Sequence, residues 1–475
     1  MRYGEVVSPY LFFRINGQPL FGVLSVFLAV LTLDCPVMRP GAITHRLAQD
    51  ATAVKLALGM QNIVILKPYR FVPPYRNRFW SRLLIRTLMR PYLKRFYGLE
   101  RFECVDGEKL RASLSAGHGI LIISNHIRQC DPMACGHLTR VVRHPMYCMA
   151  SRHVFENAWL DRVLSRRCGA FSVYREGTDH ASLQFAVQSL TQPDRPVVIF
   201  AEGSASRIND RVQPMLNGSA LIARTAARRR AKQDPAGKVV IHPLAFKYFF
   251  RGDLKLSVEP VLRNIERQLE WPTDPAKPLL ARIRRIGSEL LGRLEFECFG
   301  ESKATVHSGR CLHERIEPLI ESMLTPLEKR YDTSGGRSIY IRVQQVRTKL
   351  LPDLIAGKLN DTETAVRHRE LKTLYSVQDL ACYPRDYLGD NPSNERILET
   401  VERLEENLTD RVTVHRPYDC VMQVGDAIEV PVRRQRPGEA TETDSKPTEA
   451  DPLTLQVETA IQKMVDHLCE RGPAP

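Results

Sequence analysis

The stretch of sequence that decides the fold runs from residue 119 to residue 132 and reads GILIISNHIRQCDP. Its first part, Gly119 to Ser124, is an almost unbroken apolar run, which is typical of a strand buried on both faces of a parallel sheet. The polar His126 follows, and Asp131 with Pro132 is typical of the first turn of a helix. This order places polar side chains at the carboxyl end of a strand, where open α/β sheets have their sites.

Further apolar runs and helical patterns alternate after this stretch. The apolar runs are 146–150, 195–200 and 239–246, and the helix-like segments are 132–142, 179–190 and 218–232. Residues 254–261 alternate apolar and polar side chains, so we expect an edge strand there. Strand–helix alternation of this kind predicts an α/β fold with a mostly parallel sheet flanked by helices.

After residue 272 the pattern changes, which predicts an added helical region toward the C-terminus. Helices with charged faces are expected at 277–294, 313–329, 341–358, 362–380 and 393–407. A hairpin or a bent strand is expected at 420–430, with a turn at Gly425 and Asp426.

The chain therefore divides into six parts. They are an N-terminal extension (1–59), an α/β domain that begins with a basic helix (60–272), a helical region (273–413), a strand that returns to the core (414–433), a disordered linker (434–452), and a C-terminal helix with its tail (453–475). The extension is set apart because Met60 reads better as a protein start. The linker is set apart because it has little to bury.

The composition favours a folded protein with an anionic partner. The 475 residues are 43% hydrophobic and 26% charged, and the formal net charge is +14. Nucleic acid, an anionic membrane surface and a phosphorylated substrate all fit that charge. Eleven cysteines are scattered without a CxxC pair, which indicates reduced thiols and a cytosolic setting rather than a disulfide framework.

A basic stripe is expected on a helix over 77–97. Basic side chains recur there at every fourth residue, at Arg78, Arg82, Arg86, Arg90 and Lys94, and so lie on one face. Pro91 is expected to kink the helix. The aromatic residues of this segment fit an element that lies on a membrane surface. A solvated cationic face, packed over the core by its other side, explains the charges equally well.

His126 and Asp131 are the candidates for acid–base chemistry. A histidine titrates near neutral pH and can take the proton of a hydroxyl group. A carboxylate on its other ring nitrogen would fix the tautomer and stabilise the imidazolium. The spacing HxxxxD is not specific by itself, because His45 and Asp50 repeat it in an alanine-rich, helical setting. The position after a buried strand distinguishes His126.

Three further blocks follow in order. Arg175 lies just beyond an alternating apolar strand, and its planar guanidinium is suited to a phosphate. Glu202 and Gly203 follow the run at 195–200, where a glycine allows the backbone to approach a ligand closely. Pro243 lies within the run at 239–246.

These four blocks, in this order, resemble the glycerolipid acyltransferase family, which makes phosphatidic acid from lysophosphatidic acid. The resemblance covers roughly residues 95–261. It implies that His126 is the catalytic base and that Asp131 is its partner. It also implies roles for the other blocks: Arg175 would bind the acceptor phosphate, Glu202 and Gly203 would shape the acceptor site, and Pro243 would mark the wall of the acyl-chain pocket.

The third block departs from the family pattern. Ala201 and Ala205 stand where the family has a proline and an arginine. Either Arg207, two residues later, supplies the missing charge from a shifted position, or the acceptor carries a different head group. Arg128, inside the first block, is a further candidate for a phosphate contact, or else a solvated loop arginine.

The resemblance implies an O-acyltransferase of phospholipid biosynthesis. A fatty acyl group would move from a thioester, acyl-CoA or acyl carrier protein, to a hydroxyl of a lysophospholipid or glycerol-phosphate acceptor, in the first place 1-acylglycerol-3-phosphate. Neither a bound cofactor nor a metal is expected. The protein would be peripheral, on the cytoplasmic side of the membrane, in contact with its anionic surface.

Three alternatives stand beside this interpretation. A non-catalytic lipid-binding module on the same fold would fit the altered third block. Nucleic-acid binding fits the charge, but no recognised motif interleaves the basic residues with stacking aromatics, so no nucleic-acid partner is expected. A zinc site at His126, Cys130, Cys135 and His137 would need a ligand spacing that these residues do not have.

Overall fold

The computed structural model describes residues 67–156, 159–177, 179–300, 312–333, 335–336, 338–409, 411–432 and 450–472. The expected extension at 1–59, the second HxxxxD segment at His45 and most of the expected linker at 434–452 lie outside these residues.

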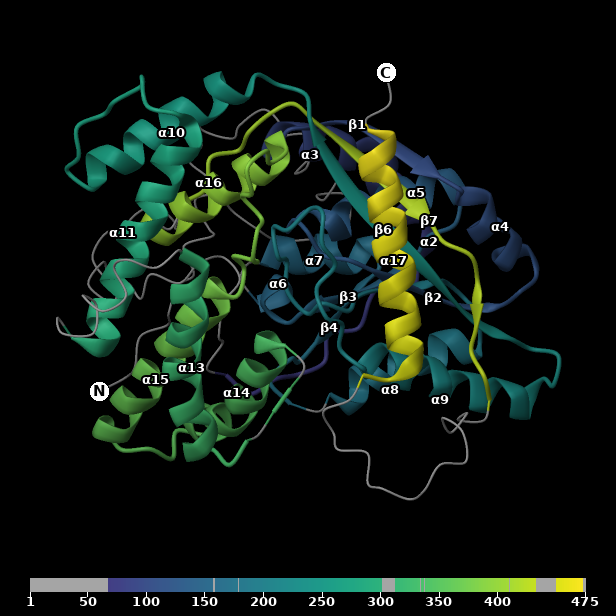
Figure 1. Cartoon of the computed structure of the whole chain (residues 1–475). Helices are drawn as coiled ribbons and strands as arrows, with labels where there is room; N and C mark the ends of the chain where they lie inside the picture. Colours follow the sequence, from purple (N-terminus) through teal and green to yellow (C-terminus); the bar gives the residue numbers. More distant parts are fainter. Residues whose placement is uncertain are drawn as a thin grey trace, which may run out of the picture.

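Within the described residues, the core is one sheet of eight strands (Figure 1). They are β1 (Leu99–Val105), β2 (Gly119–Ser124), β3 (Tyr147–Ser151), β4 (Ala170–Val173), β5 (Val197–Phe200), β6 (Val239–Phe250), β7 (Tyr418–Val424) and β8 (Ile428–Glu429). Their order is β1-β7-β6-β2-β5-β3-β4, and β8 pairs with β6. The pairs are parallel except for β6 with β7 and β6 with β8. The predicted α/β fold with a mostly parallel sheet is confirmed.

The apolar run at 119–124 is β2, which lies in the middle of the sheet with all its residues buried. Its side chains alternate between the two faces. Ile120 and Ile122 pack into one core, and Leu121 and Ile123 pack into the other, which explains why the run is apolar throughout.

Helices cover both faces of the sheet. On one face, α8 (His180–Thr191), α9 (Gly218–Gln233) and α17 (Pro452–Arg471) pack on the side of Leu121 and Ile123. On the other face lie α3 (Met89–Tyr97), α4 (Gly107–Ser115), α5 (Asp131–Val142), α10 (Leu254–Gln268) and α16 (Asn394–Thr409). Three more helices are α2 (Arg78–Thr87), α6 (His153–Glu156) and α7 (Trp159–Cys168).

The helices after residue 272 divide between two cores. The helix α11 (Leu279–Phe299) begins against the sheet core and ends in a separate apolar cluster. It shares that cluster with α13 (Leu312–Arg330), α14 (Ile339–Ile355) and α15 (Asp361–Leu380), which lie together to one side of the sheet in Figure 1. In contrast, α16 packs on α10 and β6, so it belongs to the core of the sheet.

The expected edge strand at 254–261 is wrong, because these residues begin α10. The carboxylate of Asp253 caps this helix by accepting a hydrogen bond from the backbone N–H of Leu256 at 2.8 Å. The apolar–polar alternation at 254–261 therefore predicted a strand where the helix begins. The buried residues of the segment lie at Val258, Val261, Leu262 and Ile265, which is a helical spacing.

The expected helix at 77–97 consists of two helices, α2 and α3. They meet at Leu88, three residues before Pro91. Pro91 has no N–H to donate to the carbonyl group one turn earlier, so the helix breaks there as expected. The basic residues of the stripe are all exposed.

The segment at 420–430 is a bent strand rather than a hairpin. Both β7 and β8 pair with β6, at different positions along that strand, and they do not pair with each other. Between them, the N–H of Gly425 donates to the carbonyl of Pro243 at 2.8 Å. Pro243 lies within β6, and its carbonyl group holds the bend of the returning chain through this hydrogen bond.

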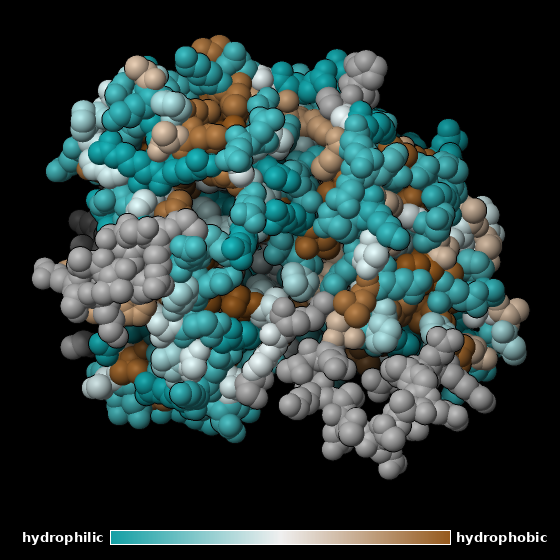
Figure 2. Space-filling model, in the orientation of Figure 1, coloured by the Kyte–Doolittle hydropathy of each residue, from teal (hydrophilic) through white to brown (hydrophobic). Residues whose placement is uncertain are grey.

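The outer surface is mostly hydrophilic in the view of Figure 2, with separate hydrophobic patches. Across the part of the chain that the structure describes, no helix has both the length and the apolar character needed to cross a bilayer.

Candidate active site

His126 and Asp131 are hydrogen-bonded at the carboxyl end of β2. His126 Nδ1 lies 2.9 Å from Asp131 Oδ2. The same oxygen accepts the backbone N–H groups of Ile127, at 2.7 Å, and Arg128, at 3.0 Å. Asp131 is the first residue of α5 and is fully buried. These hydrogen bonds to the Asp131 carboxylate stabilise the turn after β2. The turn holds His126 and Asp131, the two residues of the HxxxxD spacing, next to each other.

Asp131 sets the chemistry of the His126 ring. A carboxylate that faces Nδ1 favours the tautomer with the proton on that nitrogen. Nε2 then carries the lone pair that can take a proton from a substrate. The His126 side chain is 15% exposed, and its ring centre lies 4.6 Å from that of Phe200. The histidine is thus partly open to solvent, whereas its carboxylate partner is not.

The loop after β5 is joined to the loop after β2. These two strands pair in parallel, so both loops leave the same edge of the sheet. The backbone N–H groups of Ser206 and Arg207 donate to the carbonyls of His126 and Ile127, each at 2.8 Å. The two loops therefore form one connected surface around the histidine.

Arg175 contacts the loop after β5. Its Nη1 donates to the carbonyl of Gly203 at 2.8 Å, and the hydroxyl of Tyr340 on α14 donates to the same carbonyl at 3.1 Å. Gly203 has a φ of +84°, and a Cβ there would lie 2.5 Å from the Tyr340 ring. Only glycine fits this position. The structure thus brings together Arg175 and Gly203, two of the expected acceptor-site residues.

Glu202 is buried in the same loop. Its Oε1 accepts the backbone N–H of Gln213 at 3.0 Å. Burial raises the pKa of Glu202 well above its ordinary value, because a buried carboxylate is less stable in its charged form. Ala201 and Ala205 are buried as well.

The residues of the alternative zinc site do not converge. Cys130 and Cys135 lie in the apolar core, whereas His137 Nδ1 lies 3.0 Å from a guanidinium nitrogen of Arg90. Among the described residues, no three His, Cys, Asp or Glu side chains are grouped so that they could hold a metal ion.

Residues 101–247 match the family model described as Acyltransferase. This segment is an acyltransferase domain. It is of the glycerolipid acyltransferase family and runs from β1 to β6, with both loops of the site inside it. The searches of curated proteins and of solved structures found no match. The general role of the domain is acyl transfer.

Two carboxylates from outside the matched segment form ion pairs with arginines of the acyltransferase domain. Arg128 Nη1 lies 3.4 Å from both carboxylate oxygens of Glu402 on α16. Arg207, whose φ is +50°, forms an ion pair with Glu406 on the same helix. Two of the expected phosphate contacts are thus paired within the protein itself.

Arg128 is held on several sides. Its guanidinium carbon lies 4.4 Å from the ring centre of Tyr418 and 5.5 Å from that of Tyr248. Burial alone would lower its pKa, but the carboxylate of Glu402 and further negative groups raise the pKa well above its ordinary value. Arg128 is therefore a permanent cation of the domain rather than a solvated loop arginine.

The glutamates of α16 were missed by the sequence reasoning. Glu395, Glu399, Glu402 and Glu406 recur at helical spacing and so share one face of the predicted helix. That face was the one available signal, but Arg128 and Glu402 are 274 residues apart in the chain. No local pattern says that these glutamates meet the acyltransferase domain.

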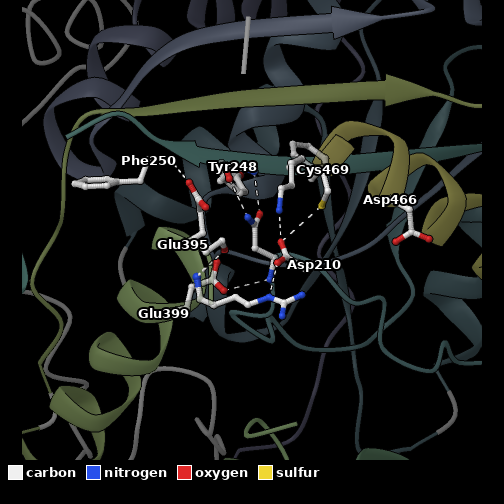
Figure 3. A network of polar contacts seen from close by, with 12 residues as sticks. Asp210, Tyr248, Phe250, Glu395, Glu399, Asp466 and Cys469 are labelled. Carbon is white, nitrogen blue, oxygen red and sulfur yellow. Dashed lines mark hydrogen bonds and ion pairs between the residues drawn. The ribbon is translucent and has the colours of Figure 1, made fainter. Parts of the chain in front are cut away.

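Figure 3 shows Glu395 and Glu399 reaching from α16 toward β6 and the loop after β5. Glu395 accepts the backbone N–H of Phe250 at 2.7 Å. Glu399 accepts the backbone N–H of Asn209 at 3.3 Å and the hydroxyl of Tyr387. Burial raises the pKa of Glu399 to about 8. Through these two hydrogen bonds, Glu399 anchors the middle of α16.

Proposed function

We propose that the protein moves a fatty acyl group from an acyl-CoA or acyl carrier protein thioester to a hydroxyl of a lysophospholipid or glycerol-phosphate acceptor. The first candidate is 1-acylglycerol-3-phosphate, which would make the reaction a step of phospholipid biosynthesis. The observation that carries the proposal is the hydrogen-bonded His126–Asp131 pair at the end of β2, inside an acyltransferase domain.

The chemistry needs one base and no covalent enzyme intermediate. His126 Nε2 takes the proton of the acceptor hydroxyl as its oxygen attacks the thioester carbonyl. Asp131 holds the proton on Nδ1 and stabilises the imidazolium that forms. When the tetrahedral intermediate collapses, the new ester C–O bond stays, the C–S bond breaks, and the leaving thiolate takes the proton from His126.

Arg175 is the first choice for the acceptor phosphate. Arg128 and Arg207 already face carboxylates of α16, whereas Arg175 donates to a backbone carbonyl. A phosphate dianion is a stronger acceptor than a carbonyl and can engage a guanidinium with two parallel hydrogen bonds. Arg128 and Arg207 would add positive potential near the site and bind phosphate only by exchanging their glutamate partners.

The protein is proposed to meet its substrates as a peripheral protein on an anionic, cytoplasmic membrane surface. The stripe residues Arg82 and Arg86 are exposed on α2. Phe79, on the same helix, is 61% exposed, and Trp159, on the neighbouring α7, is 68% exposed. Basic and aromatic side chains together suit the headgroup region of an anionic bilayer.

The acceptor class can be tested with the purified full chain and a labelled acyl thioester, given either as acyl-CoA or as acyl carrier protein. Acceptors would be lysophosphatidic acid, glycerol 3-phosphate and lysophosphatidylcholine. We expect phosphatidic acid from the first, and a KM for that acceptor raised about tenfold or more by Arg175→Ala with a smaller change in kcat. Acylation of lysophosphatidylcholine alone would overturn the phosphate acceptor. Vesicle binding with no thiol release from any donor would favour the lipid-binding module.

A further inference from the structure

The carboxylate of Asp131 receives a hydrogen bond that the HxxxxD segment does not supply. Its Oδ2 serves His126 and two backbone N–H groups. Its Oδ1 accepts the phenol hydroxyl of Tyr248, at 2.5 Å, from the opposite side. Tyr248 lies on β6, the strand next to β2. A second strand of the sheet thus supplies a hydrogen bond to the carboxylate that pairs with His126.

Tyr248 is fixed in its place. Its backbone N–H donates to Asn209 Oδ1 at 2.9 Å, and its carbonyl accepts from Asn209 Nδ2 at 2.8 Å. The side chain is fully buried, and Figure 3 shows Tyr248 beside the loop that carries Asp210. The phenol therefore has little freedom to leave Asp131, and it links the loop after β5 to the carboxylate.

The phenol is a donor rather than an acceptor in this contact. Burial and the nearby charge of Asp131 both raise the pKa of Tyr248 well above its ordinary value. A phenol donates through its O–H, and a carboxylate oxygen accepts. The direction of the hydrogen bond is thus fixed.

We propose that Tyr248 is a positioning residue for acyl transfer: it holds Asp131 Oδ1, keeps Oδ2 on His126 Nδ1, and draws negative charge away from the carboxylate. This inference rests on the proposed function, in which His126 is the base. A carboxylate that gives part of its charge to a phenol stabilises the His126 imidazolium less.

The chain offers a matched control in Tyr418, on β7. Both tyrosines are fully buried, and both rings lie against the guanidinium of Arg128. The hydroxyl of Tyr418, however, has no hydrogen-bond partner within the described residues. Tyr418→Phe therefore removes a buried hydroxyl of the same kind without touching Asp131.

The test compares Tyr248→Phe with Tyr418→Phe in the full chain, by NMR titration of ¹³C-labelled histidine and by kcat/KM against pH. The His126 signal is assigned by its loss in His126→Ala. With Tyr248→Phe, the His126 midpoint should rise by about half a pH unit to one pH unit, the size expected for one hydrogen bond. The acidic limb of kcat/KM should move equally, which lowers kcat/KM below the midpoint about threefold to tenfold. Tyr418→Phe should change neither.

A second variant separates electrostatics from packing. Site-specific replacement of Tyr248 by 3-fluorotyrosine keeps the ring and makes the phenol a stronger donor, so the His126 midpoint should fall. Opposite shifts in the two variants would support the proposal, and so would the 3-fluorotyrosine shift alone if Tyr248→Phe does not fold. An unchanged midpoint with 3-fluorotyrosine, or equal shifts in Tyr248→Phe and Tyr418→Phe, would overturn it. The titration needs no turnover, so it decides the role of Tyr248 even if the wild type transfers no acyl group, a result that would overturn the proposed function separately.

Discussion

Arg128 and Glu402 form a mostly buried ion pair that ties the loop after β2 to α16. Arg128 lies two residues after the catalytic candidate His126, whereas Glu402 lies outside the segment that matches the acyltransferase family. The helix α16 is therefore part of the support of the active-site loop. We expect the part of the chain beyond the family domain to help hold the two loops around His126 in place, since α16 pairs with Arg128 and Arg207.

Glu402→Gln should destabilise the protein by about 3 kcal/mol, because it leaves the Arg128 charge buried without its partner. Chemical denaturation measures the change in the free energy of unfolding. The pair of Glu289 with Arg293 is exposed on α11, so Glu289→Gln should cost less than about 1 kcal/mol. The double variant Arg128→Met, Glu402→Leu should recover much of the loss. Equal losses for Glu402→Gln and Glu289→Gln would contradict the role given to the buried pair.

Gly203→Ala should lower stability by about 1–3 kcal/mol through backbone strain at a φ of +84°, with a further loss from the clash with Tyr340. Adding Tyr340→Ala should relieve the clash and leave the strain. Gly218→Ala in the first turn of α9 is the control, because a Cβ there meets no atom within 4 Å. Thermal unfolding of the variants would rank them, and a neutral Gly203→Ala would contradict the tight contact with α14.

Glu399→Gln should stabilise the protein more at pH 8 than at pH 5. The carboxyl has a pKa of about 8 in the folded chain against an ordinary value of 4.5. The unfolded chain therefore releases a proton that the folded chain keeps, and wild-type stability falls as the pH rises between these values. The slope from this group is at most about 1.4 kcal/mol per pH unit. A difference between variant and wild type that stays constant from pH 5 to pH 8 would exclude a raised pKa.

Neutralising Arg82, Arg86 and Arg90 together should weaken binding to phosphatidylglycerol vesicles by up to about a hundredfold at low salt, since each basic residue near the surface contributes about 1 kcal/mol. Vesicle sedimentation measures the binding. Neutralising Lys349, Arg369 and Lys372, which are exposed on α14 and α15, changes the net charge equally and should have a much smaller effect. Equal losses in the two triple variants would indicate a net-charge effect instead of a membrane-facing basic stripe on α2 and α3.

The sequence predicts the sheet and the pair His126–Asp131 because both depend on short-range patterns. An apolar run of six residues with polar residues after it reads as a buried strand whose end carries a site, and the four residues between His126 and Asp131 are enough for a turn. The same kind of pattern misled at 254–261, where three alternating apolar residues resemble a strand. The cap at Asp253 and the helical spacing further along decide for a helix.

The rest of the site depends on contacts that no local pattern encodes. Arg128 and Arg207 read as candidates for a phosphate, and only the tertiary packing of α16 brings Glu402 and Glu406 to them. Tyr248 lies in a strand that is buried along its whole length, so alternation could not show toward which side its hydroxyl points. Long-range placement, rather than residue type, separates these residues from ordinary core positions.

The most direct test of the account is acyl-acceptor-dependent release of CoA thiol by the wild type and by His126→Ala, with folding checked by circular dichroism. Loss of a general base should lower kcat by about 10²–10⁴-fold, while His467→Ala, at an exposed position on α17, should retain wild-type turnover. A folded His126→Ala protein that transfers acyl groups at a rate within about tenfold of the wild type would contradict the assignment of His126 as the base.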